Sequence, residues 1–302
     1  MGESRRGFIL GAGAYLCWGF FPLYWPLLEP AGSIEVLAHR VIWSLFFVVF
    51  LIAVTRRWPQ LRAVAKDRTK LIYLAVAAIV ISFNWGGFIY GVTNGYVIET
   101  SLGYFINPLV TVIMGVMLLG ERLRPIQWVA LTIGFVAVVI VAIDLGHLPY
   151  IALLLAFSFA IYGLMKKKAN LGAIEGLTME TFALMPIALA FLLWLEFTSR
   201  GSFGHEGGIN VVLLVGTGIV TAIPLLMFGA AATKLSLTTL GLLQYLGPIV
   251  QFILGLLVFH EVMSQARWVG FILVWVALVI FTADAIANRR RVLRRAAEQV
   301  AI

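Results

Sequence analysis

LGYFINPLVTVIMGVMLLGE, residues 102–121, and LLQYLGPIVQFILGLLVFHE, residues 242–261, follow one plan. In each stretch a polar start and a proline precede a long apolar run, which ends at a glutamate. A shift of 140 positions aligns the two stretches and the residues after them without a gap. Ungapped matches of such distinctive residue types are hard to obtain by chance, so the chain is predicted to be an internal duplication. The shift pairs Pro108 with Pro248, Gly115 with Gly255, Glu121 with Glu261, Trp128 with Trp268 and Asp144 with Asp284.

The composition is that of a chain embedded in lipid. Of 302 residues, 62% are hydrophobic and 12% are charged, whereas about 25% of the residues of a soluble domain are charged. The mean hydropathy of +1.00 agrees with this interpretation. We therefore expect an all-α integral membrane protein. The single cysteine, Cys17, excludes an intrachain disulfide and a multi-cysteine metal site.

Ten segments are predicted to be transmembrane helices, because a helix needs about 20 residues to cross the hydrocarbon core. The first segment follows Arg5 and Arg6. It is too long for the apolar region of a signal peptide and lacks a cleavage site after it, so it is interpreted as a retained span. The predicted spans are residues 8–28, 34–54, 71–92, 99–119, 127–144, 149–165, 177–197, 209–229, 238–259 and 267–286.

The basic residues predict the orientation of these spans. With the N-terminus inside, the cytoplasmic segments collect 19 of the 22 Lys and Arg residues, as the positive-inside rule requires. Both chain ends are then cytoplasmic. The basic tail RRRVLRR, residues 289–295, is interpreted as an anchor that contacts anionic membrane lipid and not as a nucleic-acid site.

The duplication and the orientation together predict inverted-topology repeats. Each half holds five predicted spans, an odd number, so the halves must cross the membrane in opposite directions. We divide the chain into a first repeat, residues 1–144, a second repeat, residues 145–288, and the cytoplasmic tail, residues 289–302. This plan is recurrent in secondary transporters, where two halves of one fold exchange conformations around a central site.

Several motifs resemble those of the EamA family, in the drug/metabolite transporter superfamily, and within it the branch labelled chloramphenicol-sensitive. The resemblance runs in order through essentially the whole chain. It implies a ten-helix permease of the bacterial inner membrane, with a cavity lined by the first, third, fourth, sixth, eighth and ninth helices. It leaves the transported metabolite open, and the label does not establish the drug as a substrate. The motifs are HRVIWSLFF (39–47), NWGGFIYGV (84–92), SLGYFINPLV (101–110), LGERL (119–123), AFSFAIYGLMKKK (156–168) and QYLGPIVQFILG (244–255).

The polar start of each duplicated stretch is a candidate lining of that cavity. Proline removes a backbone donor and disfavours helical geometry in the residue before it. Irregular backbone at membrane depth is tolerated where it lines a water-filled cavity or is buried in protein. The alternative is a simple helix kink, with the amide side chains bonded to neighbouring helices. The candidates are Ser101, Tyr104, Asn107 and Pro108 in the first repeat and Gln244, Tyr245, Pro248 and Gln251 in the second.

Two charged residues within predicted spans are further candidates. Arg40 either anchors a carboxylate, of the substrate or of Glu180, or snorkels to the outer membrane surface. Glu180 is a candidate for proton coupling. A direct contact between the two is doubtful, because the topology puts Arg40 toward the outside and Glu180 toward the inside.

The remaining candidates are an amide and four aromatic residues. Asn84 can donate and accept hydrogen bonds, and aromatic rings can stack against a planar solute. The alternative for each is packing between helices. These candidates are Asn84 and Trp85 in the third span, Tyr15 and Trp18 in the first, and Tyr162 in the sixth.

The expected function is secondary transport of a small organic solute, outward, by alternating access. The sequence has no G-x-x-x-x-G-K-[ST] motif, so ATP bound to this chain is not the energy source. An intramembrane enzyme is disfavoured because H-E-x-x-H and G-x-S-x-G are missing, and a scaffold or regulator is the second alternative. We expect no cofactor, metal or nucleic acid. Proton coupling, import and the oligomeric state stay open.

Overall fold

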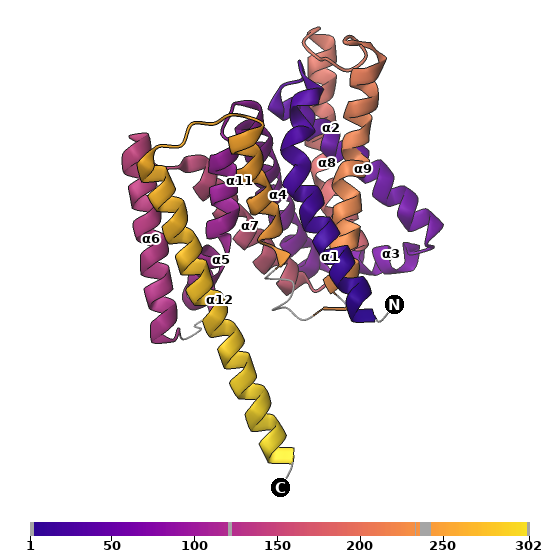
Figure 1. Cartoon of the computed structure of the whole chain (residues 1–302). Helices are drawn as coiled ribbons and strands as arrows, with labels where there is room; N and C mark the ends of the chain where they lie inside the picture. The colour runs from indigo at the N-terminus through magenta and orange to yellow at the C-terminus, as the bar shows by residue number, and fades with distance from the viewer. Residues whose placement is uncertain (1–2, 120–122, 233, 236–242, 301–302) are drawn as a thin grey trace.

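The computed structural model of the chain describes residues 3–119, 123–232, 234–235 and 243–300. The regular structure of these residues is helical (Figure 1). Both ends of the described chain lie on the same side of the bundle (Figure 1). The helices are α1 Glu3–Phe20, α2 Ser33–Val54, α3 Trp58–Lys66, α4 Arg68–Thr93, α5 Val97–Leu119, α6 Pro125–Leu145, α7 Tyr150–Ala169, α8 Ala173–Phe197, α9 Gly207–Ala232, α11 Leu246–Leu257 and α12 Gln265–Val300.

Seven of the described helices are long and apolar enough to cross a membrane, namely α2, α4, α5, α6, α8, α9 and α12. Helices α7 and α11 carry shorter apolar segments. The prediction of an all-α membrane protein is therefore confirmed. The sequence suggested that the basic tail is a separate segment after residue 288. In the structure, helix α12 continues through this tail to Val300.

The first predicted span differs from the structure in its second half. We expected one segment over residues 8–28, but α1 ends at Phe20 and two 3₁₀ turns follow, Phe21–Leu23 and Trp25–Leu28. Each turn has a proline in its first two positions, Pro22 and Pro26. Because proline cannot donate a backbone hydrogen bond, it starts a new turn more readily than it continues a helix.

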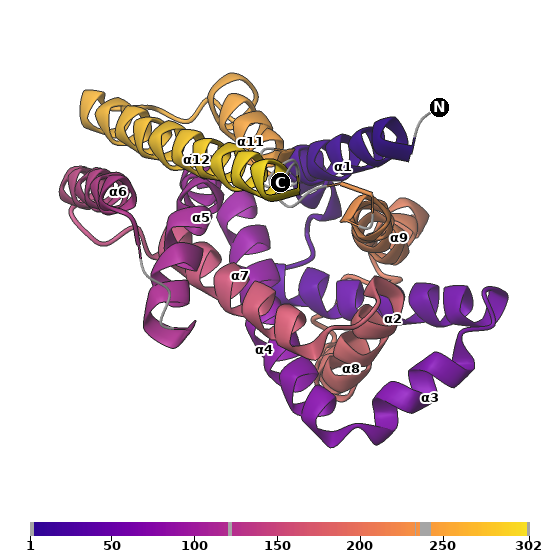
Figure 2. The ribbon, with the colours of Figure 1, turned by 90° about the horizontal axis from the view of Figure 1, so that it is seen from below.

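Helices α6 and α12, which the duplication pairs, run antiparallel and are joined at both ends. At one end Asp144 accepts hydrogen bonds from Ser264 (2.7 Å) and from Nε of Arg267 (2.8 Å). At the other end Arg124 forms an ion pair with Asp284. Asp144 and Asp284 occupy matching positions in the duplication, and each contacts a residue at the start of the other helix, so the two pairs are equivalent under the duplication. The two helices form one edge of the molecule in Figures 1 and 2.

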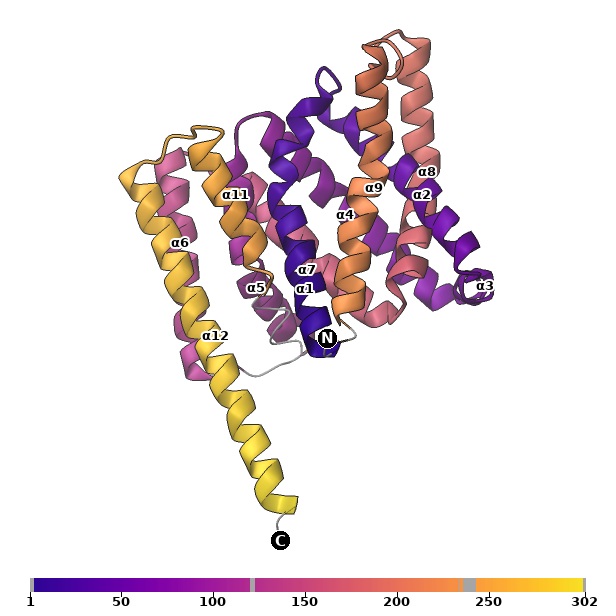
Figure 3. The ribbon, with the colours of Figure 1, turned by 45° about the vertical axis from the view of Figure 1, so that its right-hand side comes forward.

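The two halves of the chain interlock. Helix α1 lies between α9 and α11, as Figure 3 shows, α2 packs on α8 and α9, and α5 packs on α7 and α11. Contacts between neighbouring helices of the same half are fewer. Most of the described packing therefore joins one half of the sequence to the other.

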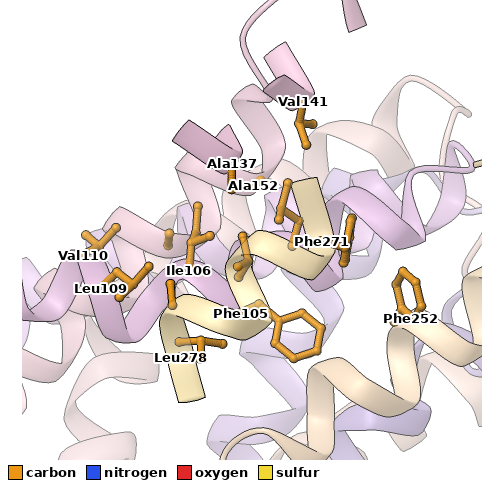
Figure 4. Packing of buried hydrophobic residues seen from close by; sticks show 14 of the residues in the cluster. Phe105, Ile106, Leu109, Val110, Ala137, Val141, Ala152, Phe252, Phe271 and Leu278 are labelled. Atoms are coloured by element: carbon orange, nitrogen blue, oxygen red, sulfur yellow. The ribbon is translucent and has the colours of Figure 1, made fainter. Parts of the chain in front are cut away.

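An aromatic cluster holds α12 against α5 and α11 (Figure 4). The ring centroids of Phe252 and Phe271 are 4.7 Å apart, and that of Phe105 is 6.3 Å from Phe271. Phe271 is 1% exposed. Because lipid is as apolar as the side chains, this cluster stabilises the fold through close packing rather than through removal of apolar surface from water.

Phe271→Ala is expected to destabilise the protein by about 2–3 kcal/mol. The same change in the core of a soluble protein costs about 3–5 kcal/mol. We expect a smaller effect here because the substitution removes packing contacts but little burial of apolar surface from water. Thermal unfolding of the purified protein in detergent measures the change. The matched control is Phe50→Ala on α2, whose side chain is 61% exposed. Equal effects of the two changes would contradict the role of the cluster.

Glu261, between α11 and α12, caps a helix of the other half. Its carboxylate accepts hydrogen bonds from the backbone N–H groups of Val97 and Ile98 at the start of α5. Glu261 therefore joins the loop before α12 to the start of α5. Burial raises the pKa of Glu261 to about 7. Its counterpart Glu121 lies outside the described residues.

This pKa predicts that stability falls as the pH rises from about 4.5, the ordinary value, to about 7. In that interval the folded protein binds more protons at Glu261 than the unfolded chain, so raising the pH favours unfolding. Glu261→Gln keeps an acceptor for the α5 amides and does not titrate, so its thermal midpoint should vary less with pH. The exposed Glu196→Gln is the control. An unchanged pH slope in Glu261→Gln would refute the prediction.

Candidate functional site

Arg40 of α2 is buried in a cage of aromatic rings. Its guanidinium carbon lies 4.0 Å from the ring centroid of Trp85, 5.3 Å from that of Trp25 and 5.8 Å from that of Phe21. Its Nε donates a hydrogen bond of 2.8 Å to Oγ1 of Thr221 on α9. The side chain is 3% exposed, so it does not snorkel to a membrane surface.

The arginine cage leaves two hydrogen-bond donors without acceptors. Nη1 of Arg40 and Nε1 of Trp25 are buried and have no partner among the residues that the structure describes. Among the described residues, no carboxylate forms an ion pair with Arg40. The charge is stabilised by the ring faces and one hydroxyl, which is less than a buried cation requires.

A polar network next to this cage joins α4, α5 and α7. Nδ2 of Asn84 donates to the carbonyl of Leu155 and to Oγ of Ser158, both at 3.0 Å. Its Oδ1 accepts a hydrogen bond of 3.1 Å from the hydroxyl of Tyr104. Tyr104 is in turn close enough to Arg40 for an electrostatic interaction. Both polar atoms of the Asn84 side chain are thus hydrogen bonded, and the amide positions the Tyr104 hydroxyl near the cation.

The proline of the first duplicated stretch does not interrupt its helix. We expected irregular backbone at Asn107 and Pro108, but both lie inside α5, which continues to Leu119. The expectation is wrong because one missing N–H donor is tolerated in a helix that neighbouring helices pack against. Pro108 and Tyr104, one turn apart, are partly exposed, whereas the residues between them are buried.

Asn107 connects the two halves of the chain. Its Nδ2 donates to the carbonyl of Ala156 on α7 at 2.9 Å, and its Oδ1 accepts a hydrogen bond of 3.3 Å from Gln244. The side chain is 3% exposed. Asn107 therefore holds α5 against α7. Gln244, which is hydrogen bonded to it, is only half buried.

The second duplicated stretch is bonded to α5 and α1. Oγ of Ser101 donates to the carbonyl of Pro248 at 2.8 Å, and Nε2 of Gln251 donates to the carbonyl of Trp18 at 3.1 Å. Oε1 of Gln251 is buried without a partner in the described part of the chain. Tyr245 is hydrogen bonded to Thr282 on α12, away from the arginine cage.

The aromatic candidates of α1 form a cluster with α9. Tyr15 and Trp18 lie edge to face with centroids 5.3 Å apart, and Phe228 is within 5.9 Å of both. Trp18 is partly exposed, whereas Tyr15 is buried. These contacts fit helix packing for Tyr15 and leave Trp18 accessible.

Glu180 forms a separate charged cluster with α7. Its carboxylate accepts hydrogen bonds from Nζ of Lys166 at 2.8 Å and from the hydroxyl of Tyr162 at 3.2 Å. Glu180 is 1% exposed. The suggested contact with Arg40 is not formed, because each side chain has its own partners. Lys166 was not among the residues predicted from the sequence. It lies four residues after the candidate Tyr162, on the same helix face, and this spacing could have identified it.

The comparisons with known proteins agree with this architecture. The EamA-like transporter family matches residues 5–143 and 149–283. Protein RarD of Streptomyces exfoliatus is 53% identical over 289 residues, which cover 96% of this chain and 92% of that protein. Protein RarD of Escherichia coli K12 is 43% identical over 96% and 98% of the two chains. The uncharacterized transporter YojE of Bacillus subtilis is 42% identical over 95% and 97%.

A solved crystal structure has the same fold. It aligns with a TM-score of 0.59 and 16% sequence identity, over 91% of this chain and 96% of the other. At this identity the match concerns the arrangement of helices alone.

Proposed function

Because this chain belongs to the EamA-like transporter family, we propose that it is a secondary transporter that exports a small organic metabolite or drug-like solute by alternating access. Family membership and the apolar helices make it a multi-pass protein of the bacterial inner membrane. Relatives named as transporters match it over nearly its whole length. The lack of a nucleotide-binding motif supports a secondary mechanism.

The observation that carries the mechanism is the antiparallel pairing of α6 and α12. These helices are equivalent in sequence, and equivalent ion pairs join them, from Asp144 to Arg267 and from Asp284 to Arg124. A helix and its repeat that run in opposite directions are what two inverted halves predict. In this proposal α1, α2, α4 to α9, α11 and α12 are the ten spans, with both chain ends cytoplasmic. Rocking of one half against the other then opens the centre to each side in turn.

We place the substrate between the arginine cage and the partly exposed side chains of α1, α5 and α7. Tyr104, Trp18 and Tyr162 combine an apolar face with partial exposure, which suits contact with a solute. The buried and bonded candidates, Asn84 and Asn107 among them, position these side chains. Pro248 and Tyr245 belong to the packing of α11 in this proposal.

Glu180 is our candidate for proton coupling. Its carboxylate is buried and neutralised by Lys166. Protonation of Glu180 would release Lys166, because the ion pair would be lost. This change would loosen the contact between α7 and α8 and so link proton binding to helix movement.

The direct test is counterflow uptake by the purified protein in proteoliposomes. Labelled amino acids, organic acids, nucleobases and chloramphenicol are each measured with and without a pH gradient. Saturable uptake of a solute class supports the proposal, and a response to the gradient supports proton coupling. Folded protein without counterflow of any solute would refute the transport proposal in favour of a scaffold.

Tyr104→Phe is expected to reduce uptake about tenfold, the effect of about 1.4 kcal/mol, because the hydroxyl near Arg40 is lost while the ring stays. Tyr90→Phe on α4 is the matched control, since Tyr90 is 42% exposed on the bundle surface. Initial counterflow rates at several solute concentrations measure both. Similar rates in the two variants would remove Tyr104 from the proposed site.

A further inference from the structure

We infer that Arg40 and Trp25 form an anion site, and that the transported solute carries a carboxylate and a net negative charge. The inference rests on the proposed transport function and names the class of its substrate. Arginine is the residue type best suited to a planar carboxylate, because its guanidinium presents parallel N–H donors.

The charge of Arg40 lacks an ion-pair partner in the described part of the chain. Arginine stays protonated in proteins, and a charge without a counter-charge is costly at membrane depth. Every buried carboxylate of the described residues already has another partner. Glu35 accepts from Ser202, Glu99 from Ile151 and Ala152, Glu175 from Arg57, and Glu180 from Lys166 and Tyr162. Among the described residues, none of these carboxylates forms an ion pair with Arg40.

The arginine cage has donors without acceptors among the residues that the structure describes. The two partnerless atoms of the cage, Nη1 of Arg40 and Nε1 of Trp25, are both donors. Oδ1 of Asn84 accepts from Tyr104 and forms no hydrogen bond with either of these donors. A ligand that satisfies two donors and a positive charge is an acceptor with negative charge, and a carboxylate has two such oxygens.

The surroundings of the Arg40 guanidinium are fixed by a hydroxyl and by aromatic rings. Nε of Arg40 is held by Thr221, and Trp85 covers one face of the guanidinium at 4.0 Å. Nη1, at the other end of the guanidinium, is the buried donor that has no partner among the described residues. The surrounding rings of Phe21, Trp25 and Trp85 are apolar and suit an uncharged remainder of the solute. A zwitterion would bring an ammonium group next to Arg40, so an organic monoanion is favoured over an amino acid.

Binding is tested apart from transport, with purified protein in detergent. A panel of aliphatic and aromatic monocarboxylates, such as lactate and benzoate, is compared with the corresponding amides and with phenylalanine. Quenching of tryptophan fluorescence reports binding, since two tryptophans form the cage. We expect the carboxylates to bind at least tenfold more tightly than their amides and than the zwitterion.

Two variants identify Arg40 as the origin of this preference. Arg40→Gln should abolish the preference for carboxylate over amide, and Arg40→Lys should retain part of it. The preference in the wild type is measured without any variant, so a variant that does not fold leaves the test intact. Equal binding of carboxylates and amides by the wild type would overturn the inference, as would an unchanged preference in folded Arg40→Gln.

The outcomes separate this inference from the proposed function. Counterflow of a neutral or zwitterionic solute, with no carboxylate preference in binding, would overturn the anion site and leave the transporter standing. Carboxylate binding without any counterflow would instead overturn the transport proposal.

Discussion

Arg40→Gln is expected to lower counterflow uptake at least a hundredfold and to leave the thermal midpoint of the protein unchanged or higher. Loss of one partner of a buried charge pair costs about 3–5 kcal/mol, which corresponds to a hundredfold or more in affinity. In the absence of substrate, Arg40 has no ion pair to lose. Its removal therefore relieves the cost of a buried cation, and a glutamine amide can still donate to Thr221.

This separation of uptake from stability is the informative part of the result. A residue that only packs helices would lose stability and uptake together. The control is Lys70→Gln at the start of α4. The Lys70 side chain is 39% exposed and pairs with Asp67, which is 38% exposed; uptake should change by less than about twofold, since surface pairs are worth about 0–1 kcal/mol. If Arg40→Gln transported at the wild-type rate, Arg40 would have no role in the site.

Gly218→Ala is expected to destabilise the fold severely, by about 3 kcal/mol, the upper end of the overpacking range. A Cβ atom at Gly218 would overlap the backbone carbonyl of Trp43 on α2. Because backbone atoms cannot rotate away as the end of a side chain does, α2 and α9 would have to separate. Those two helices carry Arg40 and Thr221, so uptake should fall as well.

Gly163→Ala on α7 is the control, because among the described residues no atom beyond the adjoining turns of its own helix lies within 4 Å of the position of its Cβ. The same chemical change should there be neutral or stabilising by up to about 1 kcal/mol, since alanine favours helix over glycine. Yield of folded protein and thermal unfolding in detergent measure both variants. Equal stability of the two would show that α2 and α9 are not in close contact at Gly218.

The sequence alone predicted the class of the protein and much of its helix pattern. A hydrocarbon core about 30 Å thick admits helices with long apolar runs, and this requirement is visible residue by residue. The duplication was equally visible, since Asp144 and Asp284 occupy matching positions. The break at Pro22 and Pro26 was the local signal that the prediction overlooked, and Pro108 was the signal to which it gave too much weight.

The partners of the candidate residues were decided by the tertiary structure. Arg40 bonds Thr221, which lies 181 positions away in the chain, and nothing in the pattern around either residue announces the other. Asn84 and Asn107 looked like solute-binding amides, yet the amide nitrogen of each donates to a backbone carbonyl of α7. The apolar composition of each segment and the repeat of 140 positions can be read directly from the chain. The sequence therefore determined that this chain forms a bundle of apolar helices in two related halves. Which polar groups neutralise one another depends on how distant helices pack, and that packing left Arg40 with its charge uncompensated.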